Sequence, residues 1–227
     1  MALDLNPILN LPLTARIKGL PATAEGLPLR EVGAQGWNLL DGSIPLPAAV
    51  IRSSVLTKNL NAFQAYIDQA GAKLAPHGKT SMCPQLFDRQ LEAGAWGMTV
   101  ATFSQANTAL DFGVKRLLIA NELVGEAEIR AVSTYQDAAP DTLILSLADS
   151  LAGVERLEAI LTAVGAVRPF EILVELGIPG GRTGARKRDA ALDIARRVAQ
   201  SSKLTLRGVE GYEGLIVTGD AVADVVR

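Results

Sequence analysis

The chain has 227 residues, of which 48% are hydrophobic, and its 22 basic residues nearly balance 24 acidic ones, leaving a net charge of -2. This length is enough to bury a full core, so one α/β domain is the simplest expectation. The charge balance argues against a dedicated nucleic-acid-binding protein, which normally carries a basic face. No uncharged apolar run approaches the ~20 residues that cross a bilayer, so no membrane association is expected.

The chain has one cysteine and one histidine, and this scarcity limits the disulfides and metal sites that it can form. One cysteine, Cys83, cannot form an internal disulfide, which fits a reducing cytoplasm. The single histidine, His77, lies six positions from Cys83, and this pair does not suggest a zinc site. The sequence therefore predicts no metal site within this chain.

The order of predicted elements indicates an arm followed by repeated βα units. Residues 1–46 are rich in proline, glycine and leucine and predict an extended arm with short helical pieces. Apolar runs and helical patterns then alternate at intervals typical of βα units. The predicted strands are residues 48–52, 73–77, 97–101, 116–120, 142–147, 170–176 and 206–211. The predicted helices are residues 56–70, 84–93, 104–112, 126–138, 150–164 and 189–201, with Ser104 and Ser150 as N-caps.

Near-continuous apolar strands favour a parallel sheet that is buried on both faces. A doubly wound open sheet and a barrel fit this alternation about equally. The absence of a Gly-x-Gly-x-x-Gly after the first strand weakens the dinucleotide-binding version of the open sheet.

The most informative stretch is residues 76–80 (PHGKT), at the end of a predicted strand. Because side chains alternate along a strand, His77 and Lys79 should project to the same side. A lysine in an enclosed site beside an imidazole can lose its proton and attack a carbonyl as an amine. A phosphate-binding P-loop would need glycine at position 73, which is Lys73, so that interpretation fails. A solvated turn lysine remains the alternative.

Seven motifs in order carry a resemblance to a known family. They are residues 35–40 (QGWNLL), 75–80 (APHGKT), 91–102 (LEAGAWGMTVAT), 118–121 (LIAN), 173–177 (LVELG), 181–184 (GRTG) and 208–214 (GVEGYEG). Together they resemble the alanine racemase N-terminal-like barrel of fold-type III pyridoxal phosphate enzymes. The similarity is greatest to the branch of D-serine dehydratase, D-threonine aldolase and bacterial amino acid deaminase.

The resemblance implies a TIM-like (β/α)8 barrel, of which about seven units are expected here. Residues 47–227 would form a partial pyridoxal phosphate-binding barrel after the arm of residues 1–46. Family members continue through a last strand, a glycine-rich phosphate loop and a C-terminal β-domain, so the chain looks truncated. In the dehydratase and aldolase branch that absent domain supplies metal ligands, and a divalent metal is expected only through it.

The resemblance also implies roles for particular residues. Lys79 would hold pyridoxal 5'-phosphate as a Schiff base and take the substrate Cα proton, and His77 would orient the cofactor or tune Lys79. Cofactor contacts are expected from Thr80, Asn121, Arg182 and Tyr212. The structural alternatives are a backbone-bonded histidine, a loop arginine and a tyrosine that caps the barrel mouth. Glu175 is expected to have a structural role and is not counted among the site residues.

The expected function is a deaminase or dehydratase that converts a small D-configured β-hydroxy amino acid, similar to D-serine, to a keto acid and ammonia. A D-threonine-type aldolase uses every residue named above and differs in the bond broken, and racemisation is a third option. A non-catalytic pyridoxal phosphate-binding barrel or an inactive fragment is the alternative outside enzyme chemistry. Because family members are often dimers, a homodimer is one assembly that the resemblance implies.

Overall fold

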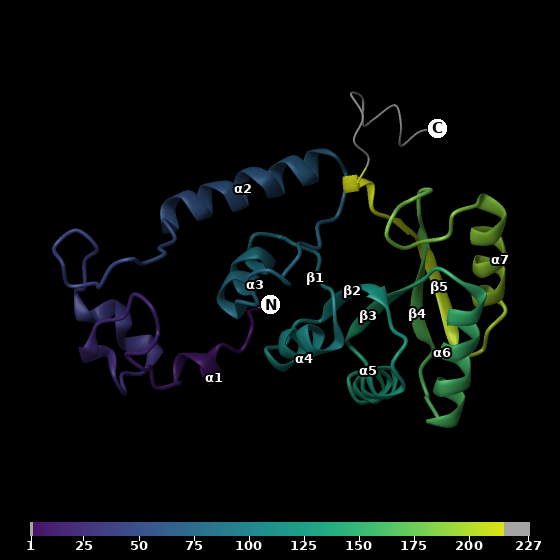
Figure 1. Cartoon of the computed structure of the whole chain (residues 1–227), viewed down its shortest axis with the longest axis horizontal. Helices are drawn as coiled ribbons and strands as arrows, with labels where there is room; N and C mark the ends of the chain where they lie inside the picture. Colours follow the sequence, from purple (N-terminus) through teal and green to yellow (C-terminus); the bar gives the residue numbers. More distant parts are fainter. Residues whose placement is uncertain (1, 216–227) are drawn as a thin grey trace. The chain divides into compact units, whose positions relative to one another are not determined.

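The computed structural model describes residues 2–215, which form two compact units. The first unit comprises residues 2–74 and 83–95 and contains the helices α1 (Asn6–Leu9), α2 (Ser53–Gln69) and α3 (Pro84–Glu92) (Figure 1). Two 3-10 turns, Ala22–Ala24 and Leu29–Gln35, lie between α1 and α2. The predicted division between an arm and a barrel at residues 46 and 47 stays a prediction.

The second unit comprises residues 75–82 and 96–215 and contains the sheet. Its elements are β1 (Met98–Val100), α4 (Phe103–Asp111), β2 (Arg116–Glu122), α5 (Glu126–Ala138), β3 (Leu143–Ala148), α6 (Leu151–Ala163), β4 (Phe170–Leu176), α7 (Arg188–Ala199), β5 (Leu204–Gly211) and a 3-10 turn at Glu213–Leu215. No helix among residues 2–215 is long and apolar enough to cross a membrane.

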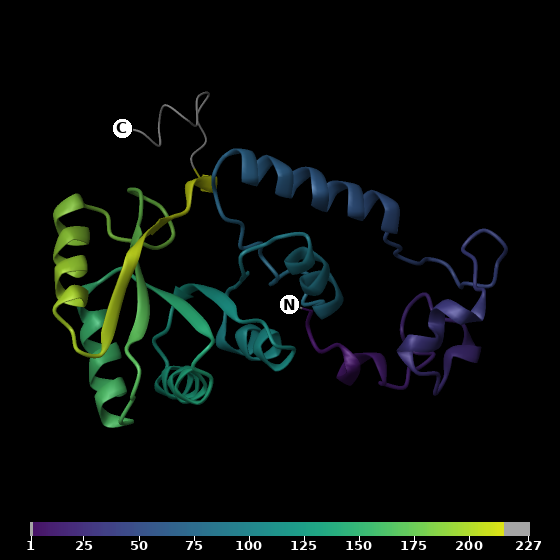
Figure 2. The ribbon, with the colours of Figure 1, turned by 180° about the vertical axis from the view of Figure 1, so that it is seen from behind.

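The five strands pair in chain order, β1-β2-β3-β4-β5, and every pair is parallel. Right-handed crossovers that always advance in the same direction place all of their helices on one face of the sheet. Accordingly, α4–α7 follow the outside of the sheet, and β5 lies at its edge (Figures 1 and 2). A doubly wound sheet would reverse its strand order at a switch point, and this sheet does not. The predicted class, an incomplete α/β barrel, is confirmed.

Two of the seven predicted strands are not strands in the structure. Residues 48–52 pair with no other segment of the described chain, and Val50 and Ile51 are exposed. An apolar run without a partner for its backbone hydrogen bonds does not form a strand, whatever its propensity. Residues 73–77 contribute a single parallel bridge, from His77 to Thr99 beside β1.

One of the two predicted helix N-caps is confirmed and the other is wrong. Ser150 begins α6 as expected, because its side chain accepts a hydrogen bond from the Gly153 N–H at 3.2 Å. The prediction of Ser104 is wrong: Thr102 caps α4 and accepts from the Gln105 N–H at 3.3 Å. Thr102 has the extended backbone that an N-cap requires, whereas Ser104 already lies in the first helical turn.

The helix-facing side of the sheet forms the apolar core. On β4, the residues that alternate with the inner face are almost fully buried: Phe170, Ile172 and Val174. Helix α7 packs on β4 and β5 and buries Ile194 and Val198. Burial of each such side chain stabilises the fold by about 1.5–3 kcal/mol. The core therefore holds the strand ends in fixed positions.

A glycine beside the first strand pair gives a test of this packing. A Cβ at Gly97 would lie 2.5 Å from the Arg116 carbonyl oxygen, which is backbone of the adjacent strand β2. We expect Gly97→Ala to lower the free energy of unfolding by about 1–3 kcal/mol because the strands must separate. Urea unfolding followed by circular dichroism measures the change.

Gly211→Ala is the matched control in the same unit, because its Cβ would lie 3.7 Å from the nearest atom. It should change stability by less than about 0.5 kcal/mol. Equal effects of the two substitutions would contradict the close approach of β1 and β2.

Candidate active site

A cavity of about 370 Å³ opens where the strands end at their carboxyl termini. Its volume is within the range of small-molecule sites, about 300–1,000 Å³. In barrels of parallel strands, this edge is where active sites form. The lining residues are His77, Lys79, Ala101, Ala120, Asn121, Leu147, Glu175, Arg182, Glu210 and Tyr212.

Backbone hydrogen bonds to β1 fix the segment that carries Lys79. The Thr99 N–H donates to the Pro76 carbonyl at 2.9 Å, and the Gly78 N–H donates to the Thr99 carbonyl at 2.7 Å. The Thr99 hydroxyl also donates to the Ala75 carbonyl at 2.7 Å. These bonds seat residues 75–78 alongside β1 although only one bridge forms. His77 and Lys79 consequently reach the same cavity, as the alternation predicted.

The environment of His77 keeps its imidazole neutral. Burial on one side lowers the pKa of His77, and the positive charge of Lys79 lowers it further, against a backbone hydrogen bond with Thr99 that raises it. Much of the residue is still exposed to solvent. At neutral pH the ring therefore offers one nitrogen as a hydrogen-bond or proton acceptor beside the lysine.

A tight loop after β4 brings Arg182 to the cavity. The Ala185 N–H donates to the Glu175 carbonyl at 2.8 Å, and the Gly177 N–H donates to the Ala185 carbonyl at 3.0 Å. Gly184 has a φ of 93°, and a Cβ there would lie 2.5 Å from the Gly177 nitrogen. Only glycine permits this approach, so the loop folds back over the strand end.

The remaining predicted residues are placed differently from one another. Asn121, near the end of β2, and Tyr212, directly after β5, both line the cavity. The Asn121 side-chain amide lies 3.5 Å from the Ala101 carbonyl, and Tyr212 is 59% exposed. Thr80 is exposed in the turn after Lys79 and is not part of the lining. The structure therefore brings together Lys79, His77, Asn121, Arg182 and Tyr212 without Thr80.

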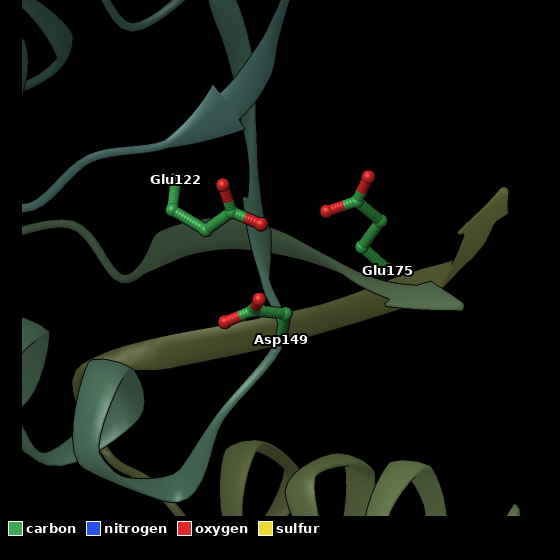
Figure 3. Close-up of side chains that lie close together, drawn as sticks. All are labelled: Glu122, Asp149 and Glu175. Carbon is green, nitrogen blue, oxygen red and sulfur yellow. The ribbon is translucent and has the colours of Figure 1, made fainter. Parts of the chain in front are cut away.

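Sequence reasoning missed the acidic side chains at this edge. Glu175, for which the sequence predicts a structural role outside the site, lines the cavity together with Glu210. The two residues are register partners on β4 and β5. Glu122 and Asp149 lie close to Glu175, and Figure 3 shows the three carboxyl groups facing a shared space. The available signal was positional, because each acid stands at or just after the end of a predicted strand.

This crowding of carboxyl groups shifts their titration. Burial raises the pKa of Glu122 to about 7, and the neighbouring carboxyls of Glu175 and Asp149 raise it in the same direction. Burial also raises the pKa of Glu210, with a contribution from Glu175, while Arg182 opposes the rise. The edge of the sheet thus holds carboxyl groups that keep protons at a higher pH than usual.

No family model matches the chain. It is 27% identical to D-threonine aldolase of Arthrobacter sp. and 28% identical to D-threo-3-hydroxyaspartate dehydratase of Delftia sp., in each case over 173 residues that make up 76% of this chain. The crystal structure of D-threonine aldolase from Filomicrobium marinum is 28% identical, with a TM-score of 0.66 over 74% of this chain.

The chain is homologous to these two enzymes. It spans 44% of the length of each of these relatives and 44% of the solved aldolase chain. Alanine racemase from E. faecalis, 18% identical with a TM-score of 0.56 over 71% of this chain and 42% of that chain, shares the fold. The predicted resemblance to the fold-type III, alanine racemase-like enzymes is confirmed.

The single histidine gives a direct test of the site's electrostatics. We expect His77 to titrate below 6.5, because burial and the charge of Lys79 both disfavour the imidazolium. Lys79→Met removes the positive charge, which is the smaller of the two causes, and should bring the pKa of His77 closer to 6.5 without reaching it. Proton NMR of the only imidazole in the chain measures both values. A pKa at or above 6.5 in the unaltered protein would contradict this arrangement.

The raised pKa of Glu122 gives a second test. Its folded-state value of about 7 exceeds the ordinary 4.5, so the folded state binds more protons between these values. The free energy of unfolding should therefore fall as the pH rises from 4.5 to 7. In Glu122→Gln this part of the fall should be absent. Urea unfolding across this pH range, with a chelator present, measures it.

Glu155→Gln, at an exposed position on α6, is the control and should keep the pH dependence of the unaltered chain. An unchanged profile in Glu122→Gln would show that the carboxyl does not carry the shift.

Proposed function

We propose that this chain forms the pyridoxal phosphate-binding part of a lyase that acts on D-configured β-hydroxy amino acids, with Lys79 as the lysine that holds the cofactor. One observation carries the proposal: one cavity at the strand ends is lined by residues from four segments of the chain, namely His77 and Lys79, Asn121, Arg182, and Tyr212. The names of the relatives, D-threonine aldolase and D-threo-3-hydroxyaspartate dehydratase, support the substrate class. A homodimer and a cytoplasmic location stay predictions.

The residues present fit pyridoxal phosphate. The cofactor needs a primary amine, donors for its anionic groups and space for a ring and a phosphate. Lys79 supplies the amine, Arg182 and Asn121 supply N–H donors, and the cavity measures about 370 Å³. Glu210 Oε2 is buried and has no hydrogen-bond partner within the described chain, so the wall of the cavity offers a ligand one further polar atom.

Bound pyridoxal phosphate supplies an electron sink that makes the substrate Cα–H acidic. Lys79 Nζ, once it is a neutral amine, accepts the Cα proton. A neutral His77 adds no charge beside this base and can accept a hydrogen bond, because burial and the lysine lower its pKa. The planar Arg182 guanidinium presents a fork of N–H donors that suits the anionic groups of the ligand.

Dehydration is our first candidate among the reactions of this class. Loss of the β-hydroxyl requires an acid as well as a base. Glu210 lines the cavity, and burial raises its pKa, so this carboxyl keeps a proton more readily than an exposed one. We assign to Glu210 the proton that leaves with the hydroxide, and the product then hydrolyses to a keto acid and ammonia.

Aldol cleavage is the second candidate. In this reaction the proton leaves the β-hydroxyl and the Cα–Cβ bond breaks, so a base near the β-hydroxyl is needed instead of an acid. The neutral imidazole of His77, in the same cavity as Lys79, supports this alternative. The products differ: glycine and an aldehyde form from aldol cleavage, and a keto acid and ammonia form from dehydration.

Cofactor attachment tests the proposal. On titration with pyridoxal phosphate, the chain should develop a visible absorbance band, and borohydride reduction should fix the label on Lys79 in peptide mass maps. Lys79→Ala should lose both signals because no other lysine among residues 2–215 lines the cavity. Lys73→Ala removes an exposed lysine outside the cavity and should keep them.

A label of equal strength in Lys79→Ala would overturn the assignment of this lysine. Assays of ammonia, keto acid and glycine with D-threonine, D-serine and D-threo-3-hydroxyaspartate then separate dehydration from aldol cleavage.

A further inference from the structure

Three carboxyl groups from neighbouring βα units converge at one point of the sheet edge. Glu122 is the last residue of β2, Asp149 follows β3, and Glu175 lies near the end of β4. One oxygen from each side chain lies within 4.8 Å of the other two. Figure 3 shows the carboxyl groups turned toward one another from three different strand ends.

An irregularity in the register of the sheet brings Glu122 into this group. Leu118 pairs with Leu145, and Glu122 pairs with Leu147, so β2 uses four residues where β3 uses two. The extra residues bulge out of the ladder and return Glu122 to the level of the β3 end. Asp149 then follows Ala148, whose partner on β4 is Val174, the residue before Glu175. Bulges that aim a side chain are typical of functional edges.

Hydrogen bonds from the protein satisfy only some of the oxygens of these three carboxyl groups. The Thr183 hydroxyl donates to Glu175 Oε1 at 2.6 Å, and the Gly184 N–H donates to Asp149 Oδ2 at 3.3 Å. Glu175 is only 3% exposed, yet its other oxygen, Oε2, is buried without a partner within residues 2–215, as is Glu122 Oε1. The ion pairs of the described chain involve none of the three.

A buried carboxylate loses its hydration, and two further carboxyl groups lie beside the almost fully buried Glu175, so this arrangement calls for a positive partner. We propose that Glu122, Asp149 and Glu175 bind one hard divalent cation of the Mg²⁺, Mn²⁺ or Ca²⁺ type. Carboxylate oxygens are the ligands that these ions prefer. Two ligands on opposite sides of one ion lie about 4.2 Å apart for Mg²⁺ and about 4.8 Å for Ca²⁺. Oxygens that all lie within 4.8 Å of one another are therefore close enough to share one ion.

This site is separate from the expected metal site, which would take its ligands from a C-terminal domain. Its geometry does not depend on the proposed function, because no contact to pyridoxal phosphate enters the argument. Glu175 also lines the cavity of Lys79, so the ion would lie beside that cavity. The rival explanation is that the half-buried Glu122 and the buried Glu175 share a proton and bind no metal.

Titration with Mn²⁺ tests the proposal on the full chain without pyridoxal phosphate. Electron paramagnetic resonance counts the free ion and should show one bound Mn²⁺ per chain, which Mg²⁺ or Ca²⁺ displaces. Glu175→Gln and Asp149→Asn keep the side-chain shape but remove a charged ligand, and each should weaken binding at least tenfold. Glu155→Gln, at an exposed position on α6, should bind like the unaltered chain.

Thermal unfolding guards against a variant that fails to fold. Mn²⁺ should raise the melting temperature of the unaltered chain and, at the same concentration, raise that of Glu175→Gln much less. Absence of stoichiometric Mn²⁺ binding, or binding that survives both substitutions, would overturn the site in favour of the shared proton. Attachment of pyridoxal phosphate to Lys79 is measured separately, so failure of one proposal leaves the other intact.

Discussion

Parallel pairing of successive strands in chain order is the constraint on which the rest of this structure depends. Because every crossover runs in the same direction, α4–α7 lie on one face and all five strands end at one edge. The helices supply the apolar burial that fixes the strands, and the edge receives the side chains that follow them. Lys79, Arg182 and Tyr212, from distant parts of the sequence, meet in one cavity at this edge.

The edge is polar at a cost to stability. Glu122, Asp149 and Glu175 crowd together, and Glu210 lies opposite Glu175 on the next strand. Like charges in a partly buried place raise the free energy of the folded state unless a proton or a cation joins them. Natural chains keep such unfavourable groupings where they serve a ligand or a reaction. The carboxyl groups therefore support the view that this edge is the functional one.

The two cations of the cavity are held in different ways. Lys79 follows a segment whose backbone is bonded to β1, whereas Arg182 stands in a loop closed by glycines and by the bonds of Ala185. A fixed lysine suits a residue that must meet a reactive carbon, and a charged arginine on a tight loop suits recognition of anionic groups. The names of the relatives include both an aldolase and a dehydratase.

Local periodicity and short motifs can be read along the chain, so the sequence alone predicted the alternation of strands and helices, the resemblance to the family and Lys79 as a candidate. It overestimated the strands, since residues 48–52 have propensity but no partner, and it chose Ser104 over Thr102 because a cap depends on backbone conformation. The strand order, the position of Thr80 outside the cavity and the proximity of Glu122 to Glu175 follow only from the folded chain. These depend on register between strands that are far apart in sequence, and periodicity within one strand carries no information about its neighbour.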